Sequence, residues 1–339
     1  MIEWGSFWYA VRIVLEQLVL YLYQKKMNKC LYCYKPLNGE ADFHEKCNLD
    51  FFGSKNTPVL SYTIDQMAEL AKNVVERSVS VPGVQAKLSM SLIKEAQETS
   101  DSRLTVVGAL GGGYIFKPPS EKFAEMPQNE HLTMRIAEAF GIRVVPSSLI
   151  RLASGELSYI TKRIDREGEG EKIHMIDMFQ ITEAFDKYKS SMERIGKSLG
   201  MYSENPLLDK LFFFELALFS FLTGNNDMHL KNFSMIETAS GWVLSPAYDL
   251  LNVSIINPED DEELALTIQG KKKKIKREHF DRLGEELGLT PKQLKGVYNR
   301  FRNNKAKAMQ LIDNSFLTTQ MKEAYADLLE DRYARVFVE

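Results

Sequence analysis

GNNDMHLKNFSMIETASGWVLSPAYDLLN, residues 224–252, holds the most informative spacing in this sequence. Asp227 is followed five positions later by Asn232, and a second carboxylate, Asp249, comes after a short run of alternating apolar residues. Protein kinases use this spacing for the Asp that accepts the hydroxyl proton and an Asn that holds Mg²⁺. The layout therefore predicts a phosphoryl-transfer site, although Asp and Asn are also frequent in ordinary loops.

The residues next to this spacing favour the same interpretation. Residues 233–236 and 242–244 predict the two strands of a hairpin between Asn232 and Asp249. The metal-binding Asp of a kinase follows such a hairpin, so Asp249 is the second Mg²⁺ candidate. Upstream, residues 207–223 are almost entirely apolar, which predicts a buried central helix that leads directly into the catalytic loop.

With 339 residues, 44% of them apolar and 26% charged, the chain has the composition of a soluble globular protein with two or three domains. Its net charge of −3 argues against a protein that wraps nucleic acid by itself, and its three cysteines predict a reducing cytoplasm rather than a disulfide framework. Residues 7–23 are apolar, but Arg12, Glu16 and Gln17 interrupt a run shorter than the ~20 residues of a membrane-spanning helix. A docking amphipathic helix is expected there, and Met27 is an alternative start.

Every cysteine of the chain lies in one cluster, CLYCYKPLNGEADFHEKC, with the spacing C-x2-C-x10-H-x2-C. Three thiolates and one imidazole are a ligand set that structural Zn²⁺ binds tetrahedrally. The alternative is a group of buried reduced thiols beside an exposed histidine. The prediction is a closed zinc knuckle without a catalytic role, with the ligands Cys30, Cys33, His44 and Cys47.

A region rich in predicted strands follows this cluster. The segment SVSVPGVQAKL, residues 78–88, combines small residues with Pro82, Gly83 and Lys87 ahead of a strand. This composition suits a loop that binds phosphate through backbone N–H groups. An ordinary Pro-Gly turn before a strand has the same composition, so the segment alone is weak evidence.

A strand lysine and a helix acid form the next pair of candidates. In YIFKPP, Lys117 ends an apolar strand, where a lysine needs a negative partner unless it points to water. Glu130 begins a predicted helix over residues 130–140, where a kinase keeps the acid that pairs with this lysine. A carboxylate is also favourable at any helix N-terminus. In KRIDRE, Lys162–Asp165 predicts an extended hinge whose backbone can hydrogen-bond an adenine.

The motifs SVSVPGVQAKL, YIFKPP, PQNEHLTMRIAEAFGI, KRIDRE, GNNDMHLKNFS and SPAYDLLN, in this order, resemble those of the HipA-like toxin Ser/Thr kinases of bacteria. The resemblance runs from residue 78 to the C-terminus. It implies an α+β, bilobal, protein-kinase-like (HipA-like) fold with a smaller sheet-rich N-lobe and a larger all-helical C-lobe. The expected domains are an N-terminal helix with the zinc knuckle, an N-lobe with the phosphate loop and hinge, and a C-lobe with the catalytic loop, at 1–57, 58–165 and 166–339.

The resemblance also implies roles for single residues. Asp227 would be the catalytic base, Asn232 and Asp249 the Mg²⁺ ligands, and Lys117 the contact to the α and β phosphates. In this family a phosphate-loop serine, here Ser78 or Ser80, is autophosphorylated, which expels the loop and adds about two negative charges beside the triphosphate. The ATP-binding residues would be Val81, Gly83, Val84, Gln85, Lys87, Lys117, Lys162, Ile164, His229 and Lys231.

The chain is most similar to the short, HipT-like members, because few residues precede the phosphate loop. The implied partners are a HipB-like helix-turn-helix antitoxin, a small HipS-like subunit, or both, together with a protein substrate such as an aminoacyl-tRNA synthetase. No direct contact with nucleic acid or membrane is expected. The basic run Lys271–Lys274 predicts a solvated turn rather than a nucleic-acid contact.

Three functions remain open from the sequence. The leading one is an ATP- and Mg²⁺-dependent Ser/Thr protein kinase that acts as a growth-arresting toxin in the cytoplasm. A second is a catalytically vestigial corepressor that binds a helix-turn-helix antitoxin, and a third is a lipid or small-molecule kinase with the same lobes. The combination of Lys117, Asp227, Asn232 and Asp249 favours catalysis, because a scaffold has no need of it.

Overall fold

The computed structural model describes residues 28–77, 87–94, 102–107, 112–120, 122–167 and 170–337. The chain divides into two compact units, Met1–Thr57 and Pro58–Glu339. The helix expected at 7–23 lies outside the described residues. Within the described part, no helix is both long enough and apolar enough to cross a bilayer.

The first unit is small and is described from residue 28 onward. An isolated antiparallel bridge joins Lys29 to Pro36, and one short helix, α2 (Glu45–Phe52), follows. Phe51 and Phe52 are buried and their rings meet edge to face, with centroids 4.7 Å apart. Two rings at the end of one short helix therefore supply much of the apolar packing here.

The second unit begins with helix α3 (Ile64–Arg77) and a five-stranded antiparallel sheet. The strands run in the spatial order β2-β1-β3-β5-β4, so β1 lies between β2 and β3 and pairs with both. Gly112 has φ +81°, and a Cβ there would lie 2.3 Å from the Met90 carbonyl oxygen, so this approach to β1 requires glycine. The strands are β1 (Leu88–Lys94), β2 (Ser102–Val107), β3 (Tyr114–Lys117), β4 (Ser147–Arg151) and β5 (Leu157–Lys162).

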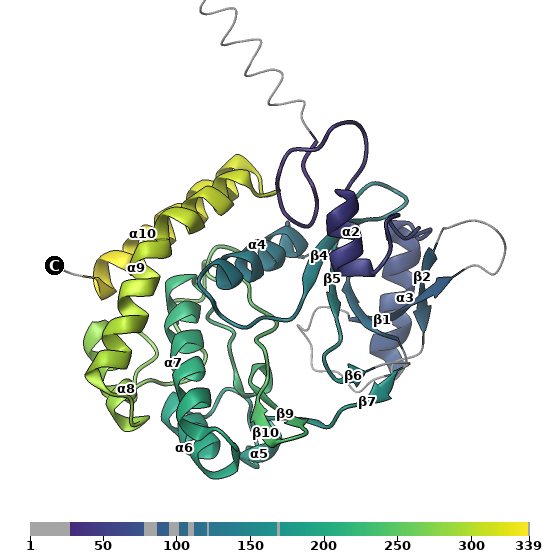
Figure 1. Cartoon of the computed structure of the whole chain (residues 1–339). Helices are drawn as coiled ribbons and strands as arrows, with labels where there is room; N and C mark the ends of the chain where they lie inside the picture. The colour runs from purple at the N-terminus through teal and green to yellow at the C-terminus, as the bar shows by residue number, and fades with distance from the viewer. Residues whose placement is uncertain are drawn as a thin grey trace, which may run out of the picture. The chain divides into compact units, whose positions relative to one another are not determined.

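Helix α4 (Met126–Ala139) links the sheet to the helical half. It begins earlier than the predicted start at residue 130, because Pro127 occupies its first turn, where a proline is favourable. It packs on β4 and β5 on one side and on helix α9 on the other. In Figure 1, α4 lies between the strands of the sheet and the helices α6–α10.

The helical half surrounds the predicted apolar helix, α7 (Pro206–Leu222). It is buried over most of its length because it packs against α6, α8, α10 and β10. A helix that is apolar on every face is stable only when it is covered on all sides. The other helices of this half are α5 (Met178–Ile181), α6 (Met192–Tyr202), α8 (Arg277–Glu286), α9 (Pro291–Asn314) and α10 (Thr319–Val336).

The expectation of an all-helical C-lobe is wrong. The predicted hairpin is present as β9 (Ser234–Thr238) and β10 (Gly241–Leu244), and β8 (Met175–Asp177) adds a third strand beside β9. A second small hairpin, β6 (Arg166–Glu167) and β7 (Glu171–Lys172), follows the predicted hinge. Strands of two or three residues carry no periodic pattern, so the sequence does not reveal them.

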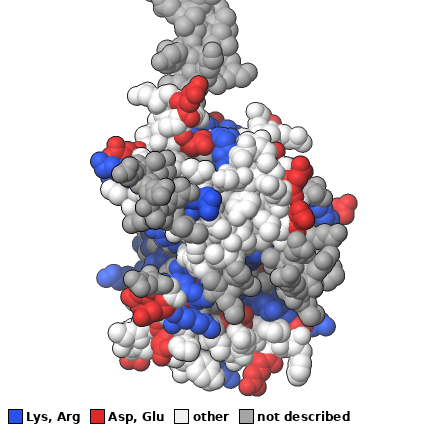
Figure 2. Space-filling model, turned by 90° about the vertical axis from the view of Figure 1, so that its right-hand side faces the viewer, with Lys and Arg blue, Asp and Glu red and all other residues white. Residues whose placement is uncertain are grey.

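Charges of both signs are distributed over the surface. On the face in Figure 2, Lys and Arg side chains are interspersed with Asp and Glu. Two of the four lysines in the basic run form ion pairs: Lys272 Nζ lies 3.0 Å from Glu262 Oε2, and Lys273 pairs with Asp261. This run is a turn ahead of α8, as predicted, with acidic partners from the preceding loop.

Candidate active site

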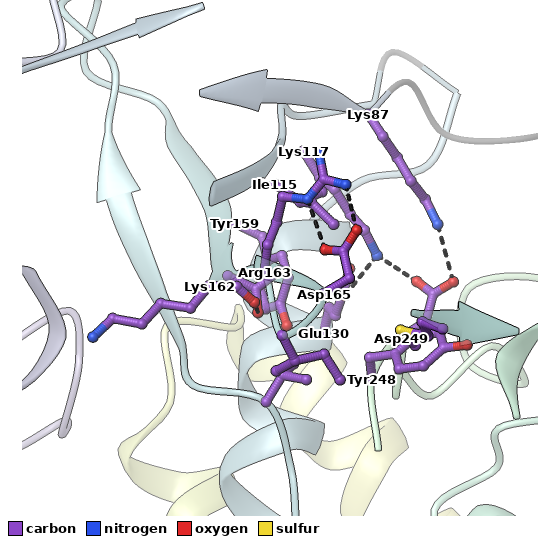
Figure 3. A pocket seen from close by; sticks show the side chains of 14 residues that line it. Lys87, Ile115, Lys117, Glu130, Tyr159, Lys162, Arg163, Asp165, Tyr248 and Asp249 are labelled. Carbon is purple, nitrogen blue, oxygen red and sulfur yellow. Dashed lines mark hydrogen bonds and ion pairs between the residues drawn. The ribbon is translucent and has the colours of Figure 1, made fainter. Parts of the chain in front are cut away.

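A buried lysine forms the centre of the site. Lys117 is the last residue of β3 and is only 4% exposed. Its Nζ lies 2.6 Å from Glu130 Oε1 on α4 and also forms an ion pair with Asp249 Oδ1 (Figure 3). A buried ammonium is stable only with such partners. The structure thus brings together Lys117, Glu130 and Asp249, which the sequence assigned to one site from three separate motifs.

A second lysine completes the charge balance around Asp249. Lys87 precedes β1, and its Nζ lies 3.3 Å from Asp249 Oδ2. Burial alone would raise the pKa of Asp249, but the charges of Lys117 and Lys87 outweigh it and hold this pKa well below its usual range. In Figure 3 both lysine side chains extend toward this one carboxylate. Asp249 therefore stays ionised at any ordinary pH.

The other two members of this ion-pair group, Lys117 and Glu130, both have raised pKa values, but for different reasons. Burial opposes the charge of Lys117, yet Asp249 and Glu130 together raise its pKa above the usual value. Burial raises the pKa of Glu130 to about 7, against the lowering effect of Lys117. Within the described residues, Asp249 has two lysine partners, Lys117 and Lys87, whereas Glu130 has only Lys117, which it shares with Asp249. Asp249 therefore holds its negative charge more firmly than Glu130 does.

Backbone pairing fixes the segment that carries Asp249. Upstream, the Val145 N–H donates to the Ala247 carbonyl at 2.9 Å, in a parallel bridge next to β4. Downstream, the Asn129 side chain of α4 bonds both backbone groups of Asn252, donating to its carbonyl at 3.0 Å and accepting from its N–H at 2.7 Å. Asp249, between these anchors, has φ 60°, a conformation unfavourable for a non-glycine residue. The sheet and α4 thus hold the loop against Lys117.

A cavity of about 240 Å³ adjoins this group. Its lining includes Lys87, Lys117, Glu130 and Asp249 together with the predicted hinge, Lys162–Asp165. A volume of this order suits part of a small-molecule ligand rather than a protein side chain. The sequence prediction of a nucleotide pocket bounded by the strand lysine and the hinge is consistent with this lining.

The hinge residues have distinct environments. The Lys162 N–H already donates to the Pro146 carbonyl at 2.9 Å, and its side chain extends away from the other labelled residues in Figure 3. Ile164 makes no backbone hydrogen bond within the described part of the chain, so its N–H and carbonyl can meet a ligand. Asp165 is held by Arg163, whose Nη2 lies 2.6 Å from Asp165 Oδ2, and this bond lowers the pKa of Asp165. Of the two residues predicted to bind adenine, Ile164 is therefore the better placed as a donor.

The loop that was predicted to be catalytic begins where α7 ends. Gly224 has φ +68°, and a Cβ there would lie 2.6 Å from Asn252 Oδ1, so the turn out of the helix requires glycine. Asp227 follows, and its Oδ1 accepts a hydrogen bond from the Tyr188 hydroxyl at 2.8 Å. Burial raises the pKa of Asp227 above its usual range, while the Tyr188 bond and the charge of Lys187 act in the opposite direction. This carboxylate is therefore more ready to take up a proton than an exposed aspartate.

The other predicted site residues of this loop, Asn232, His229 and Lys231, each contact a neighbouring group. Asn232 Nδ2 donates to the Asp227 carbonyl at 3.1 Å, which leaves the amide oxygen of Asn232 as the atom that can face a cation. His229 Nε2 lies 2.9 Å from Lys187 Nζ, and burial together with the Lys187 charge lowers the pKa of His229 to about 4. Lys231 Nζ is 4.9 Å from the Phe179 ring centroid. The loop is thus fixed by one hydrogen bond within it and by tertiary contacts with Lys187 and Phe179.

The loop that contains Asp227 does not line the cavity described above. Asp227, His229, Lys231 and Asn232 are absent from the residues that line the described cavity, although three of them were among the predicted nucleotide or metal contacts. The charge of Asp249 nevertheless raises the pKa of Asp227, so the two carboxylates interact electrostatically. This arrangement places a proton acceptor next to a cavity, rather than inside it.

Sequence reasoning missed Tyr188 and Lys187. Both come from the loop between α5 and α6, and their contacts with Asp227 and His229 are tertiary. No spacing pattern in that loop marks them. Several predicted residues lie outside the described part of the chain: Ser78, Ser80, Val81, Gly83, Val84 and Gln85.

The predicted metal-ligating residues of the first unit lie together. The ligand atoms of Cys30, Cys33, His44 and Cys47 are all within 4.8 Å of one another. No other group of three or more His, Cys, Asp or Glu side chains in the described part of the chain is close enough to share an ion.

Comparison with known proteins identifies the family. A family model described as a HipA-like C-terminal domain matches residues 79–309, which is more than half of the chain, so the chain belongs to this family. A Haemophilus influenzae protein with the name "Putative kinase" is 29% identical over 193 residues, 53% of this chain and 54% of that protein. The "Serine/threonine-protein kinase toxin HipA" of Shewanella oneidensis is 29% identical over 211 residues, 56% of this chain and 46% of that protein. The chain spans about half the length of these curated relatives.

A solved structure shares the fold. The Shewanella oneidensis toxin–antitoxin complex of HipA, HipB and operator DNA matches with a TM-score of 0.64 and 22% identity, over 83% of this chain and 72% of that chain. The α+β fold of this chain is therefore HipA-like, as the motifs indicated. The expectation of no contact with nucleic acid does not fit this neighbour, whose complex includes operator DNA.

Proposed function

We propose that the chain is an ATP- and Mg²⁺-dependent serine/threonine protein kinase of a toxin–antitoxin pair. The observation that carries the proposal is the buried contact of Lys117 with both Glu130 and Asp249 beside the hinge-lined cavity. A kinase needs a strand lysine oriented by a helix acid and a carboxylate next to the phosphates. Membership of the HipA-like family and the names of its relatives point to the same chemistry.

The residues divide the work between binding and proton transfer. Lys117 and Lys87 would bind phosphate oxygens, since both ammonium groups face the cavity and are now balanced only by carboxylates. The free backbone groups of Ile164 would bind the adenine edge. Asp227, which already accepts a hydroxyl hydrogen bond from Tyr188, would accept the proton of the substrate hydroxyl.

Two oxygen ligands are available for Mg²⁺. The Asp249 carboxylate and the Asn232 amide oxygen are the hard donors that this ion prefers. Asp249 suits this role because its pKa is held well below the usual range, so protons do not compete with the ion for its carboxylate. When bound, the ion would neutralise charge on the nucleotide phosphates.

A label-transfer experiment tests this proposal. The purified full chain is incubated with γ-labelled ATP and Mg²⁺, and label on protein is compared between the wild type and Asp249→Asn. We expect label on the chain itself, at Ser78 or Ser80, and its loss in the variant. Absence of nucleotide binding by the wild type would contradict the proposal and favour the corepressor alternative. Label appearing only in the non-protein fraction of a cell extract would indicate a lipid or small-molecule kinase.

The cellular role follows from the family. An antitoxin of the HipB-like or HipS-like kind would restrain the kinase, and the solved HipA neighbour is in complex with HipB. The substrate would be a translation protein such as an aminoacyl-tRNA synthetase, acted on in the cytoplasm. Phosphoproteomics of cells that express the wild type or Asp227→Asn would identify it, since a true substrate gains phosphate only with the wild type. Growth arrest by both chains alike would contradict a kinase toxin.

A further inference from the structure

We propose that Cys30, Cys33, His44 and Cys47 form a structural zinc site that holds the first unit of the chain together. The family match begins at residue 79, so these residues lie outside the matched region, and the proposal does not depend on kinase activity.

The distances fit a tetrahedral metal ion. Zn²⁺ binds sulfur at ~2.3 Å and imidazole nitrogen at ~2.0–2.1 Å, so a sulfur and a nitrogen on one tetrahedron lie ~3.5 Å apart. In the structure, Cys33 Sγ is 3.4 Å and Cys47 Sγ is 3.7 Å from His44 Nδ1. All four ligand atoms are within 4.8 Å of one another. The two sulfur–nitrogen distances therefore match those of a zinc tetrahedron, and the other two ligand atoms are close enough to complete it.

The orientation of His44 supports the same conclusion. Its Nε2 lies 3.0 Å from the Pro36 carbonyl oxygen, which can only accept a hydrogen bond. Nε2 therefore carries the proton, and the lone pair of Nδ1 faces Cys33 and Cys47. A metal-ligating histidine commonly donates its other N–H to a carbonyl in this way. A single lone pair can accept one thiol proton, whereas a cation between the three atoms satisfies both sulfurs and the nitrogen.

Local backbone structure brings the two ligand pairs together. The Cys30 N–H donates to the Lys35 carbonyl and the Tyr34 N–H to the Cys30 carbonyl, each at 2.9 Å, and Tyr34 has φ 63°. This tight turn places Cys30 and Cys33 on one side. His44 is the N-cap of α2 and Cys47 lies in its first turn, so side chains three positions apart share a face. The turn and the helix start thus present two ligands each.

The unit needs a cross-link that the described chain does not otherwise supply. None of its three cysteines is in a disulfide. Even the whole unit, Met1–Thr57, is smaller than the ~70–80 residues at which one hydrophobic core begins to be sufficient. Small units of this kind are commonly held by a metal, and binding energy then becomes folding energy. With all four tetrahedral positions taken by the chain, the site has no open position for catalysis.

Metal analysis of the purified full chain tests the proposal. Protein expressed in zinc-supplemented medium is dialysed and measured for zinc and iron, and we expect about one zinc per chain. His44→Ala should reduce this content at least fivefold, while the matched control His174→Ala, in the other unit, should keep it. Less than a tenth of an equivalent in the wild type, or iron in place of zinc, would overturn the proposal.

A second measurement covers the case in which His44→Ala fails to fold. Wild-type chain in reducing buffer is alkylated with and without a strong zinc chelator, and modified cysteines are counted by mass spectrometry. We expect all three thiols to be protected until the chelator is added, and Co²⁺ to restore protection with the visible absorption of a tetrahedral thiolate site. Equal alkylation with and without chelator means reduced thiols without a metal, and that result contradicts the proposal.

Discussion

Asp227 and Asp249 belong to one stretch of sequence but have opposite surroundings. Asp249 lies between the ammonium groups of Lys87 and Lys117, which hold its pKa well below the usual range despite burial. Burial raises the pKa of Asp227, and its hydrogen-bond partner is the neutral hydroxyl of Tyr188. Environments that push two carboxylates apart in pKa separate their tasks. The comparison supports Asp249 as the cation ligand and Asp227 as the base.

The largest expected effect is the loss of phosphoryl transfer in Asp227→Asn. The amide keeps the shape and can still accept from Tyr188, but it cannot take a proton. We expect the rate of label transfer to fall by a factor of about 10²–10⁴, the usual contribution of a general base. Nucleotide affinity, measured by calorimetry, should be unchanged, because Asp227 does not line the cavity.

The control for this variant is Asp327→Asn on the exposed side of α10, which should transfer label at the wild-type rate. If Asp227→Asn bound nucleotide much more weakly but turned it over at the normal maximal rate, Asp227 would be a binding residue. The assignment of tasks to the two carboxylates would then be reversed.

The second expected effect is on the free energy of unfolding, which Asp249→Asn should lower and Asp227→Asn should not. Asp249→Asn leaves the buried Lys117 with Glu130 alone, and removing one partner of a buried pair costs about 3 kcal/mol of unfolding free energy. Asp227→Asn removes a carboxylate that burial disfavours, so its stability should equal or exceed that of the wild type. Urea unfolding of both variants at pH 7 measures the difference. Equal losses would show that the two aspartates are held alike.

The charged residues at the centre of the site, Lys117, Glu130 and Asp249, were largely predictable from the sequence. A lysine at the end of an apolar strand, as at 117, needs a negative partner on elementary grounds. The sequence paired this lysine with Glu130, whereas Asp249 was predicted as a Mg²⁺ ligand of the same site and not as a partner of Lys117. The cluster of Cys30, Cys33, His44 and Cys47 was predictable for the same reason, because ligand type and spacing are local properties. Both groups depend on chemistry that few other arrangements satisfy.

The tertiary contacts that complete the site were much less predictable. The bond from Tyr188 to Asp227 joins two loops that only the packing of α6 and α7 brings together. Lys87 reaches Asp249 across the fold by the same kind of tertiary contact. The order β2-β1-β3 could not be inferred either, because consecutive strands usually pair, which would place β3 beside β2. Contacts of this kind leave no periodic signal.

The third carboxyl group of the site, Glu130, extends the comparison to the dependence of stability on pH. Its pKa is raised from the ordinary 4.5 to about 7 by burial, against the effect of Lys117. Between these values the folded chain holds a proton that the unfolded chain releases. The contribution of this group therefore favours folding at low pH and is lost as the pH rises through 7.

Glu130→Gln removes that titration. The stability of the wild type relative to this variant should fall by about 2–3 kcal/mol between pH 5 and pH 8. Unfolding by urea across that range measures the difference, and Glu138→Gln, partly exposed on the same helix, is the control. A relative stability that rises with pH would mean that Glu130, not Asp249, holds the ammonium of Lys117 more firmly.

The smallest expected effect comes from the hydroxyl of Tyr188. Its hydrogen bond lowers the pKa of Asp227, so Tyr188→Phe should raise that pKa further. A hydrogen bond to a charged carboxylate is worth about 1.5 kcal/mol or somewhat more, which corresponds to roughly one pKa unit. The acid side of the pH–rate profile should move to higher pH by that amount, because Asp227 must be unprotonated to act as a base. Tyr202→Phe on the surface of α6 should leave the profile in place. An unchanged profile in Tyr188→Phe would mean that the substrate hydroxyl displaces Tyr188 before transfer, so that Asp227 works without this bond.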